Sequence, residues 1–242
     1  GLKRWTQKWH ESYEDFYPLN TDGTGNNRRG DWGYPALFEV SDSVFMLLTE
    51  ADITRENCGS WLNNQTDRTR YTIRMQEDEL NCSKGWKSTW NVLIVGTLAD
   101  VVESTLVTDV STPCAIEDTE WIKPGLCAWD HWWSGEVKME MGVIKEYIDL
   151  AAAHGWPYML IDWQWYGPYN EAGADITKPA PQLDMPEILR YAEEKGVRIW
   201  LWLYSSDVNR NDAYKEAFRL YQKWGVAGIK IDFMDRDDQM MV

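Results

Sequence analysis

The chain has 242 residues, enough for one large domain or two of moderate size. It carries 39 acidic and 24 basic side chains, a net charge of −15, which argues against a nucleic-acid partner because phosphate binding needs a basic face. Its longest apolar runs are of strand length, so the sequence predicts no membrane span.

Residues 1 to about 118 have the pattern of β-structure. Four runs rich in β-branched, aromatic or alternating apolar residues predict strands at 37–40, 44–50, 71–75 and 89–96. Turn-forming residues such as Asp22-Gly23-Thr24-Gly25-Asn26-Asn27 separate the runs. Short strands at this spacing indicate a β-sandwich that is present only in part.

From about residue 120 the pattern changes to strands that alternate with helices. Strands are predicted at 125–132, 158–162, 197–204 and 226–232, and helices at 137–154, 184–195 and 211–224. The second helix has the residues of a helix start, with Asp184 as N-cap, Pro186 in the first turn and Glu187 three residues after the cap.

These four strand–helix units predict a parallel sheet flanked by helices. A doubly wound open sheet is the competing layout, but no glycine-rich nucleotide motif follows any strand. Four units make half of a (β/α)8 barrel, so we expect the protein to continue past Val242. The predicted division is a sandwich portion at 1–118 and the first half of a barrel at 119–242.

Acidic and aromatic residues stand where the predicted strands end. The runs Ala128-Trp129-Asp130 and Leu160-Ile161-Asp162-Trp163 show this pattern, and the fourth strand ends at Asp232. The carboxyl ends of the strands form the active-site face of such barrels, and tryptophan faces stack on sugar rings. The pattern therefore favours carbohydrate chemistry.

Lys230 and Asp232 are two residues apart on one strand, so both side chains are predicted to point to the barrel interior. A carboxylate that attacks a sugar must stay ionised, and a neighbouring cation lowers its pKa. A buried structural ion pair is the alternative interpretation, and the other strand-end acids favour a site.

The order and spacing of several segments across residues 35–242 resemble glycoside hydrolase family 97. These segments are Trp121-Ile122-Lys123-Pro124-Gly125, Ala128-Trp129-Asp130-His131-Trp132-Trp133, Tyr158-Met159-Leu160-Ile161-Asp162-Trp163 and Gly228-Ile229-Lys230-Ile231-Asp232-Phe233-Met234-Asp235-Arg236-Asp237-Asp238-Gln239. The resemblance implies a bacterial exo-acting α-glucosidase or α-galactosidase. It also implies an N-terminal β-super-sandwich, a central (β/α)8 barrel and a small C-terminal β-domain.

The resemblance also implies roles for single residues. Asp232 occupies the position of the nucleophile in retaining members, which favours an α-galactosidase that acts on oligosaccharides; the acid/base residue is expected beyond Val242. An α-glucosidase on the same scaffold and a catalytically silent carbohydrate-binding protein are the alternatives. A periplasmic or secreted location is expected from the family alone.

Further residues are expected around the sugar. Asp130, Asp162 and Lys230 are predicted to hold sugar hydroxyls, and the pocket walls are predicted to be Trp129, Trp163 and Trp165. The family binds Ca²⁺, and the segment Leu48-Thr49-Glu50-Ala51-Asp52 matches the part of the sandwich that supplies a ligand, which makes Glu50 the candidate. The four cysteines show no paired spacing, so a zinc or redox site is not expected.

Overall fold

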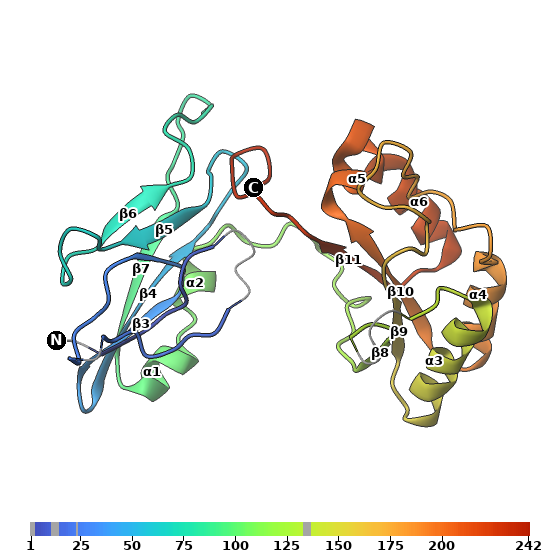
Figure 1. Ribbon diagram of the computed structural model, residues 1–242, viewed down its shortest axis with the longest axis horizontal. Coiled ribbons are helices and arrows are strands. Elements are labelled where there is room, and N and C mark those ends of the chain that lie inside the picture. Colours follow the sequence, from blue (N-terminus) through green and yellow to red (C-terminus); the bar gives the residue numbers. More distant parts are fainter. Residues whose placement is uncertain (1–2, 11–14, 23, 133–136) are drawn as a thin grey trace. The chain divides into compact units, whose positions relative to one another are not determined.

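The computed structural model describes residues 3–10, 15–22, 24–132 and 137–242. The chain forms two compact units, Gly1–Glu117 with Asp235–Val242, and Asp118–Met234 (Figure 1). Our sequence-based boundaries assign 235–242 to the barrel. In the structure this segment joins the first unit, where the Gly59 N–H donates to the carbonyl of Asp237 and the Asn81 N–H donates to Oε1 of Gln239.

The first unit is built from two antiparallel sheets. The larger sheet has the order β1-β3-β4-β7 and the smaller one the order β2-β5-β6. The strands are β1 (Lys3–Trp5), β2 (Asp31–Trp32), β3 (Ala36–Ser41), β4 (Val44–Ala51), β5 (Ser60–Asn63), β6 (Thr72–Met75) and β7 (Trp90–Gly96). The four predicted strands correspond to β3, β4, β6 and β7. The short strands β1, β2 and β5 were not predicted.

The core of the first unit follows the two-residue period of its strands. Phe38 of β3 packs with Trp32 and Leu62 of the smaller sheet. On the opposite face of the larger sheet, Val92 and Ile94 pack with Val101. Val101 belongs to α1 (Leu98–Glu103), which is followed by α2 (Leu106–Asp109); neither helix was predicted. Apolar contacts on both faces of the larger sheet explain why its strands look continuously hydrophobic in the sequence.

The second unit contains one parallel sheet of order β11-β10-β9-β8. Its strands are β8 (Cys127–Trp129), β9 (Tyr158–Ile161), β10 (Arg198–Tyr204) and β11 (Gly228–Asp232), and its longer helices are α3 (Met141–Ala153), α4 (Met185–Glu194) and α6 (Tyr214–Trp224). The predicted alternation of parallel strands and helices is confirmed. Together with the sheet-rich first unit, it has the architecture expected for part of a sandwich and the start of a barrel.

The helix boundaries follow from local sequence. Oδ1 of Asp184 accepts the backbone N–H of Glu187 at 3.1 Å, which confirms the predicted N-cap of α4. Helix α6 ends at Gly225, whose φ of +77° is a left-handed conformation that glycine adopts without strain. These signals fix where each helix starts or stops, and so the length of the connection to the next strand.

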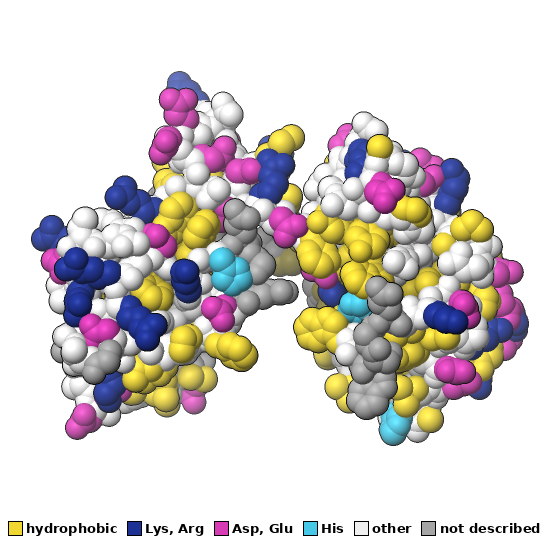
Figure 2. All heavy atoms as spheres, viewed as in Figure 1, with side chains coloured by type: hydrophobic (Ala, Val, Ile, Leu, Met, Phe, Trp, Pro, Cys, Tyr) yellow, Lys and Arg dark blue, Asp and Glu magenta, His cyan; other side chains and the backbone are white. Residues whose placement is uncertain are grey.

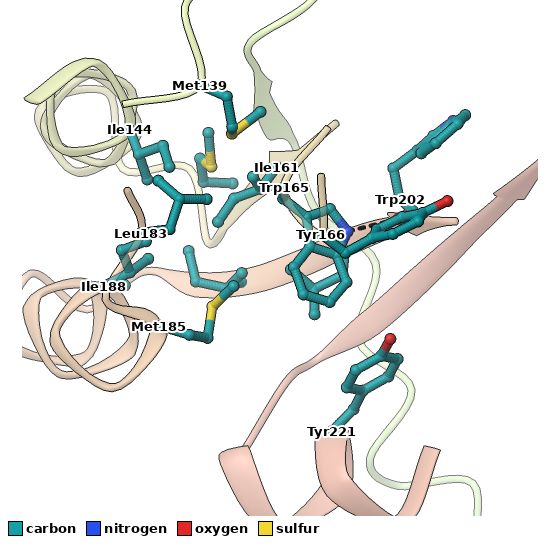
Figure 3. Packing of buried hydrophobic residues seen from close by; sticks show 14 of the residues in the cluster. Met139, Ile144, Ile161, Trp165, Tyr166, Leu183, Met185, Ile188, Trp202 and Tyr221 are labelled. Atoms are coloured by element: carbon teal, nitrogen blue, oxygen red, sulfur yellow. Dashed lines mark hydrogen bonds between the residues drawn. The ribbon is translucent and has the colours of Figure 1, made fainter. Parts of the chain in front are cut away.

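Alternation along β10 divides the second unit into a core face and a site face. Ile199, Leu201 and Leu203 are at most 1% exposed and belong to the core that includes the helices. Burial of each such side chain is worth about 1.5–3 kcal/mol. On the other face of the strand, Trp202 and Tyr204 pair in register with Lys230 and Asp232 of β11. Figure 3 shows this core, with Trp202 beside Trp165.

A short helix, α5 (Ser205–Asn209), follows β10 directly and was not predicted. The N-cap of this helix is Tyr204, and Asp207 lies inside the first turn. Its side chain is fully buried. Oδ2 accepts the hydroxyl of Tyr166 at 2.9 Å and the N–H of Asn170 at 2.8 Å, and Oδ1 lies 3.2 Å from the guanidinium of Arg210.

Large hydrophobic side chains are exposed on both units, among scattered acidic and basic groups (Figure 2). Examples are Val95 and Val102 in the first unit and Leu126 and Trp132 in the second. Within the part of the chain that the structure describes, no helix is long and apolar enough to cross a membrane. The thiols of Cys58, Cys82, Cys114 and Cys127 are all free.

Candidate active site

The predicted site residues of the second unit meet at the carboxyl ends of three strands. Asp130 directly follows β8, Asp162 directly follows β9, and Asp232 is the last residue of β11. The strands are parallel, so their carboxyl ends lie along one edge of the sheet. Asp162 is 3% exposed, whereas Trp163 is partly exposed.

Lys230 connects two of these carboxylates. Its Nζ lies 3.0 Å from Oδ2 of Asp232 and 3.6 Å from Oδ2 of Asp162. The same ammonium group lies 4.8 Å from the centroid of the Trp129 ring, within the range of a cation–π contact. The predicted common orientation of Lys230 and Asp232 is therefore confirmed. The ammonium group also lies within ion-pair distance of a second carboxylate, that of Asp162.

The carboxylate of Asp232 is held by three donors. Besides Lys230, the indole Nε1–H of Trp202 donates to Oδ2 at 3.0 Å, and the N–H of Phe233 donates to Oδ1 at 2.9 Å. Burial by itself raises the pKa of Asp232, but the bonds from Trp202, Lys230 and Phe233 outweigh it and leave the pKa below its usual value. The side chain is still 27% exposed. Asp232 thus combines an ionised carboxylate with access from solvent.

Phe233 has a left-handed backbone conformation, with φ of +54°. Both of its backbone polar groups are bonded: the N–H to Asp232, and the carbonyl oxygen to the hydroxyl of Ser205 at 2.7 Å. A left-handed conformation is unfavourable for an aromatic residue, and such strain often occurs at functional sites. Phe233 thereby links the carboxylate of Asp232 to Ser205 of α5.

Asp162 is more enclosed than Asp232. Its Oδ2 accepts the indole N–H of Trp129 at 2.7 Å, and its Oδ1 accepts the N–H of Trp163 at 2.8 Å. Its side chain is 4% exposed. A charged group that is this well buried needs several polar partners, and Lys230, Trp129 and the Trp163 backbone provide them.

Asp130 lies behind Asp162 and is buried. Its Oδ1 accepts the backbone N–H of Asp162 at 3.0 Å, and its Oδ2 has no hydrogen-bond partner among the described residues. Burial raises the pKa of Asp130 to about 7, and the nearby charge of Asp162 acts in the same direction. In this arrangement Asp130 supports the backbone that carries Asp162. Direct contact between Asp130 and a sugar stays a prediction.

Two of the three predicted tryptophans lie at the site. Trp129 contacts Asp162 and Lys230, and the Trp163 ring stacks on Tyr169 with 5.6 Å between centroids. The prediction for Trp165 was wrong: it is 0% exposed and its indole N–H donates to the carbonyl of Trp202 at 2.7 Å (Figure 3). Trp165 comes after the strand has ended, so alternation no longer indicates where it points.

Sequence reasoning missed an aromatic row beside the acids. Trp163 stacks on Tyr169, Tyr169 on Tyr204, and Tyr204 on Phe233, with centroid separations between 5.2 and 5.8 Å. It also missed Trp202. The i, i+2 spacing of Trp200, Trp202 and Tyr204 on one strand was a usable signal for three aromatic side chains on the site face. Tyr169 lies in a loop and had no such signal.

Glu50, the predicted calcium ligand, belongs to the first unit and lies near the end of β4. Its Oε1 accepts the hydroxyls of Ser60 at 2.8 Å and Thr89 at 3.2 Å. Burial raises the pKa of Glu50, although these two hydrogen bonds oppose the shift. The donor chemistry fits one hard-oxygen ligand for Ca²⁺. Among the described residues, no three His, Cys, Asp or Glu side chains come together as a metal site.

Comparison with known proteins covers both units. Residues 1–113 match the model of the glycosyl-hydrolase 97 N-terminal domain, and residues 126–242 match the model of glycoside hydrolase 97. A probable retaining α-galactosidase of Streptomyces bingchenggensis (strain BCW-1) is 31% identical over 234 residues, which is 95% of this chain and 35% of that protein. A retaining α-galactosidase of Bacteroides thetaiotaomicron is 36% identical over an alignment of 268 positions, which covers 98% of this chain and 39% of that protein.

Solved structures show the same fold. A glycoside hydrolase family 97 enzyme from Pseudoalteromonas sp. strain K8, in complex with acarbose, superposes with a TM-score of 0.75 at 19% identity, over 98% of this chain and 38% of that one. A β-arabinopyranosidase superposes with a TM-score of 0.73 at 25% identity, over 99% of this chain and 42% of that one. The chain thus spans less than half the length of these relatives. The two family models describe one family and together account for nearly all of the sequence, so the chain belongs to glycoside hydrolase family 97.

Proposed function

We propose that the full-length protein is an exo-acting glycoside hydrolase that removes terminal α-linked galactose with retention of configuration, and that Asp232 is its nucleophile. The observation that carries the proposal is the state of Asp232. It is an ionised and accessible carboxylate at the end of β11, 3.0 Å from the ammonium group of Lys230. The names of the two sequence relatives, both retaining α-galactosidases, support the substrate class.

In this proposal Asp232 attacks the anomeric carbon. The bond from that carbon to the leaving oxygen breaks, and the leaving oxygen takes a proton from a carboxylic acid about 5–5.5 Å from the nucleophile. That acid is expected on a later strand, outside the present sequence. Water then cleaves the glycosyl–Asp232 ester, and the same acid/base group removes its proton.

Lys230 and Asp162 are proposed to bind the sugar beside the nucleophile. Each oxygen of an ionised carboxylate has two acceptor positions, so Asp162 keeps acceptor capacity beyond its bonds to Trp129 and Trp163. Lys230 donates to hydroxyls while it holds the pKa of Asp232 down. Trp129 and Trp163 provide apolar faces at the same edge of the sheet, and Asp130 fixes the position of Asp162 from behind.

A β-arabinopyranosidase is the second candidate, favoured by the 25% identity with that solved structure. A β-L-arabinopyranoside has the ring configuration of an α-D-galactoside without the hydroxymethyl group at C5. The two activities therefore differ in whether the pocket leaves room for that group. Substrate measurements distinguish the two activities.

The proposal is tested by comparing kcat/KM for p-nitrophenyl α-galactoside, α-glucoside and β-L-arabinopyranoside with the full-length protein. We expect the galactoside to be the best substrate. A preference for the glucoside would indicate the α-glucosidase alternative, and a preference for the arabinoside would indicate the second candidate. Sugar binding without turnover of any of the three would indicate a binding protein.

We further propose that Glu50 contributes one ligand to a Ca²⁺ ion. The other oxygen ligands would come from later parts of the barrel in the full-length protein. A bound calcium ion would supply a fixed positive charge close to acidic groups. The partly buried Glu50 carboxylate, which accepts the hydroxyls of Ser60 and Thr89, supports this role.

A further inference from the structure

We propose that Trp202 is the positioning residue of the nucleophile: its indole N–H fixes the orientation of the Asp232 carboxylate and keeps that carboxylate ionised. The inference rests on the proposed role of Asp232. A residue of the hydrophobic core, on the neighbouring strand β10, thereby has a specific part in the reaction.

The two side-chain donors to Asp232 differ in how firmly they are held. Lys230 has a flexible side chain that is 34% exposed, and its ammonium group is shared with Asp162. Trp202 is 1% exposed, and its Nε1–H donates to Oδ2 of Asp232 at 3.0 Å. A buried ring with one N–H defines one direction, whereas an ammonium group on a flexible chain does not. Trp202 therefore sets the orientation, and Lys230 supplies the charge.

The structure holds Trp202 itself on several sides. Its carbonyl oxygen accepts the indole N–H of Trp165 at 2.7 Å. The rings of Tyr169, Tyr204 and Phe233 all meet its ring edge-to-face, with centroid separations of 5.5, 6.1 and 6.3 Å. Rotating the indole away from Asp232 would disrupt these three ring contacts together. The aromatic row thus has a defined consequence, which is to keep a hydrogen-bond donor pointed at the nucleophile.

An indole N–H suits this position because it donates a hydrogen bond without adding a charge. It does not titrate at the pH values where enzymes work, so it stabilises the carboxylate form at every relevant pH. The charged and titratable groups near Asp232 are Lys230 on the same strand, Asp162 after β9, which shares Lys230 with it, and the phenols of Tyr169 and Tyr204 around Trp202. Loss of the Trp202 donor leaves all of these in place.

The test is the pH dependence of kcat/KM for the full-length protein with Trp202→Phe. We expect kcat/KM to fall about tenfold or more, since a hydrogen bond to a charged group is lost, mainly through kcat. We also expect the acid limb of the profile to move to higher pH, because the pKa of Asp232 rises. Activity that needs the carboxylate is lost as pH falls through that pKa, so a raised pKa moves the loss upward.

Tyr221→Phe is the matched control, because it removes a buried side-chain donor from the same core, and that donor bonds the carbonyl of Ile176 rather than Asp232 or Trp202. It should lower the melting temperature and leave the acid limb in place. If Trp202→Phe does not fold, replacement of Trp202 by β-(3-benzothienyl)alanine keeps the ring volume and removes the donor.

An acid limb that stays in place in a folded Trp202 variant would overturn the inference and leave Trp202 as a packing residue, even if the rate falls. An acid limb that moves equally in Tyr221→Phe would overturn it as well. Failure of the proposed function can be distinguished from failure of this inference, because Asp232→Asn would retain its turnover only if Asp232 is not the nucleophile.

Discussion

The ammonium nitrogen of Lys230 lies 3.0 Å from the carboxylate of Asp232, and the two residues are separated by one position on the same strand. This spacing places both side chains on the site face of β11, in register with Trp202 and Tyr204 of β10. The carboxylate gains a cation, an indole donor and a backbone donor while part of its surface stays open. These are the requirements of a nucleophile that must be ionised and must reach a substrate.

Replacement of Asp232 by Asn should lower kcat by several orders of magnitude in the full-length protein, because the amide keeps the volume and loses the nucleophilic oxygen. Steady-state kinetics with p-nitrophenyl α-galactoside measures this. Azide should partly restore the activity of Asp232→Ala by occupying the vacated position. Asp212→Asn, a change of an exposed carboxylate in the same unit, is the control and should have normal rates. Near-normal turnover of Asp232→Asn would show that Asp232 is not the nucleophile.

The first sugar released should have the α-configuration, because attack by Asp232 followed by attack of water inverts the anomeric carbon twice. Proton NMR of the reaction in its first minutes, before mutarotation, distinguishes the anomers. Appearance of the β-anomer first would show inversion, and Asp232 would then no longer be a nucleophile.

The buried ion pair of Asp207 should matter more for stability than an exposed pair of the same spacing. Asp207→Ala removes the partner of Arg210 and the acceptor of the Asn170 N–H, and should destabilise the unit by about 3 kcal/mol. Lys215→Ala breaks the exposed pair with Asp212 and should change stability by less than about 0.5 kcal/mol. Thermal melting compares the two. Equal effects would mean that the Asp207 network is solvated rather than buried.

The stability of the protein should depend on pH through Asp130. Its pKa is raised to about 7 in the folded state, from about 3.9 in an unfolded chain. The folded state therefore binds more protons between these two values, and the contribution of this group to stability falls as pH rises through that window. Asp130→Asn cannot ionise, so its melting temperature should exceed that of the wild type at pH 8, and the difference should shrink toward pH 4. A difference that does not change with pH would contradict the raised pKa.

Much of the second unit followed from its sequence because its signals are local. The cap at Asp184, the stop at Gly225 and the apolar runs of the four strands each depend on a few neighbouring residues. The Lys230–Asp232 pair needed nothing beyond the alternation of a strand. In the first unit, β2 and β5 are short and their pairing joins residues about thirty positions apart, as in the register of Asp31 with Asn63, so no local pattern indicates them.

The site was harder to predict where the chain leaves its regular elements. Asp162, Trp163 and Trp165 follow the end of β9, and only the tertiary fold decides that Asp162 faces Lys230 while Trp165 enters the core. The support of Asp162 by Asp130 passes through a backbone N–H, which the residue type does not reveal. Strand alternation indicates that Trp202 lies on the site face, a signal that our sequence analysis did not use, and its hydrogen bond to Asp232 depends on the register between β10 and β11.

Calcium should affect both the rate and the stability of the full-length protein. We expect EDTA to lower the activity and added Ca²⁺ to restore it. Because an ion that binds only the folded state stabilises it by mass action, EDTA should also lower the melting temperature. Glu50→Gln keeps an oxygen that can accept the hydroxyls of Ser60 and Thr89 but loses the charge, so it should shift both calcium responses to higher concentrations. Glu39→Gln, a change of another glutamate in the first unit that pairs with Lys3, should leave both responses unchanged. If neither activity nor melting responds to EDTA or to the Glu50 substitution, Glu50 is a partly buried acid that links Ser60 and Thr89 by hydrogen bonds.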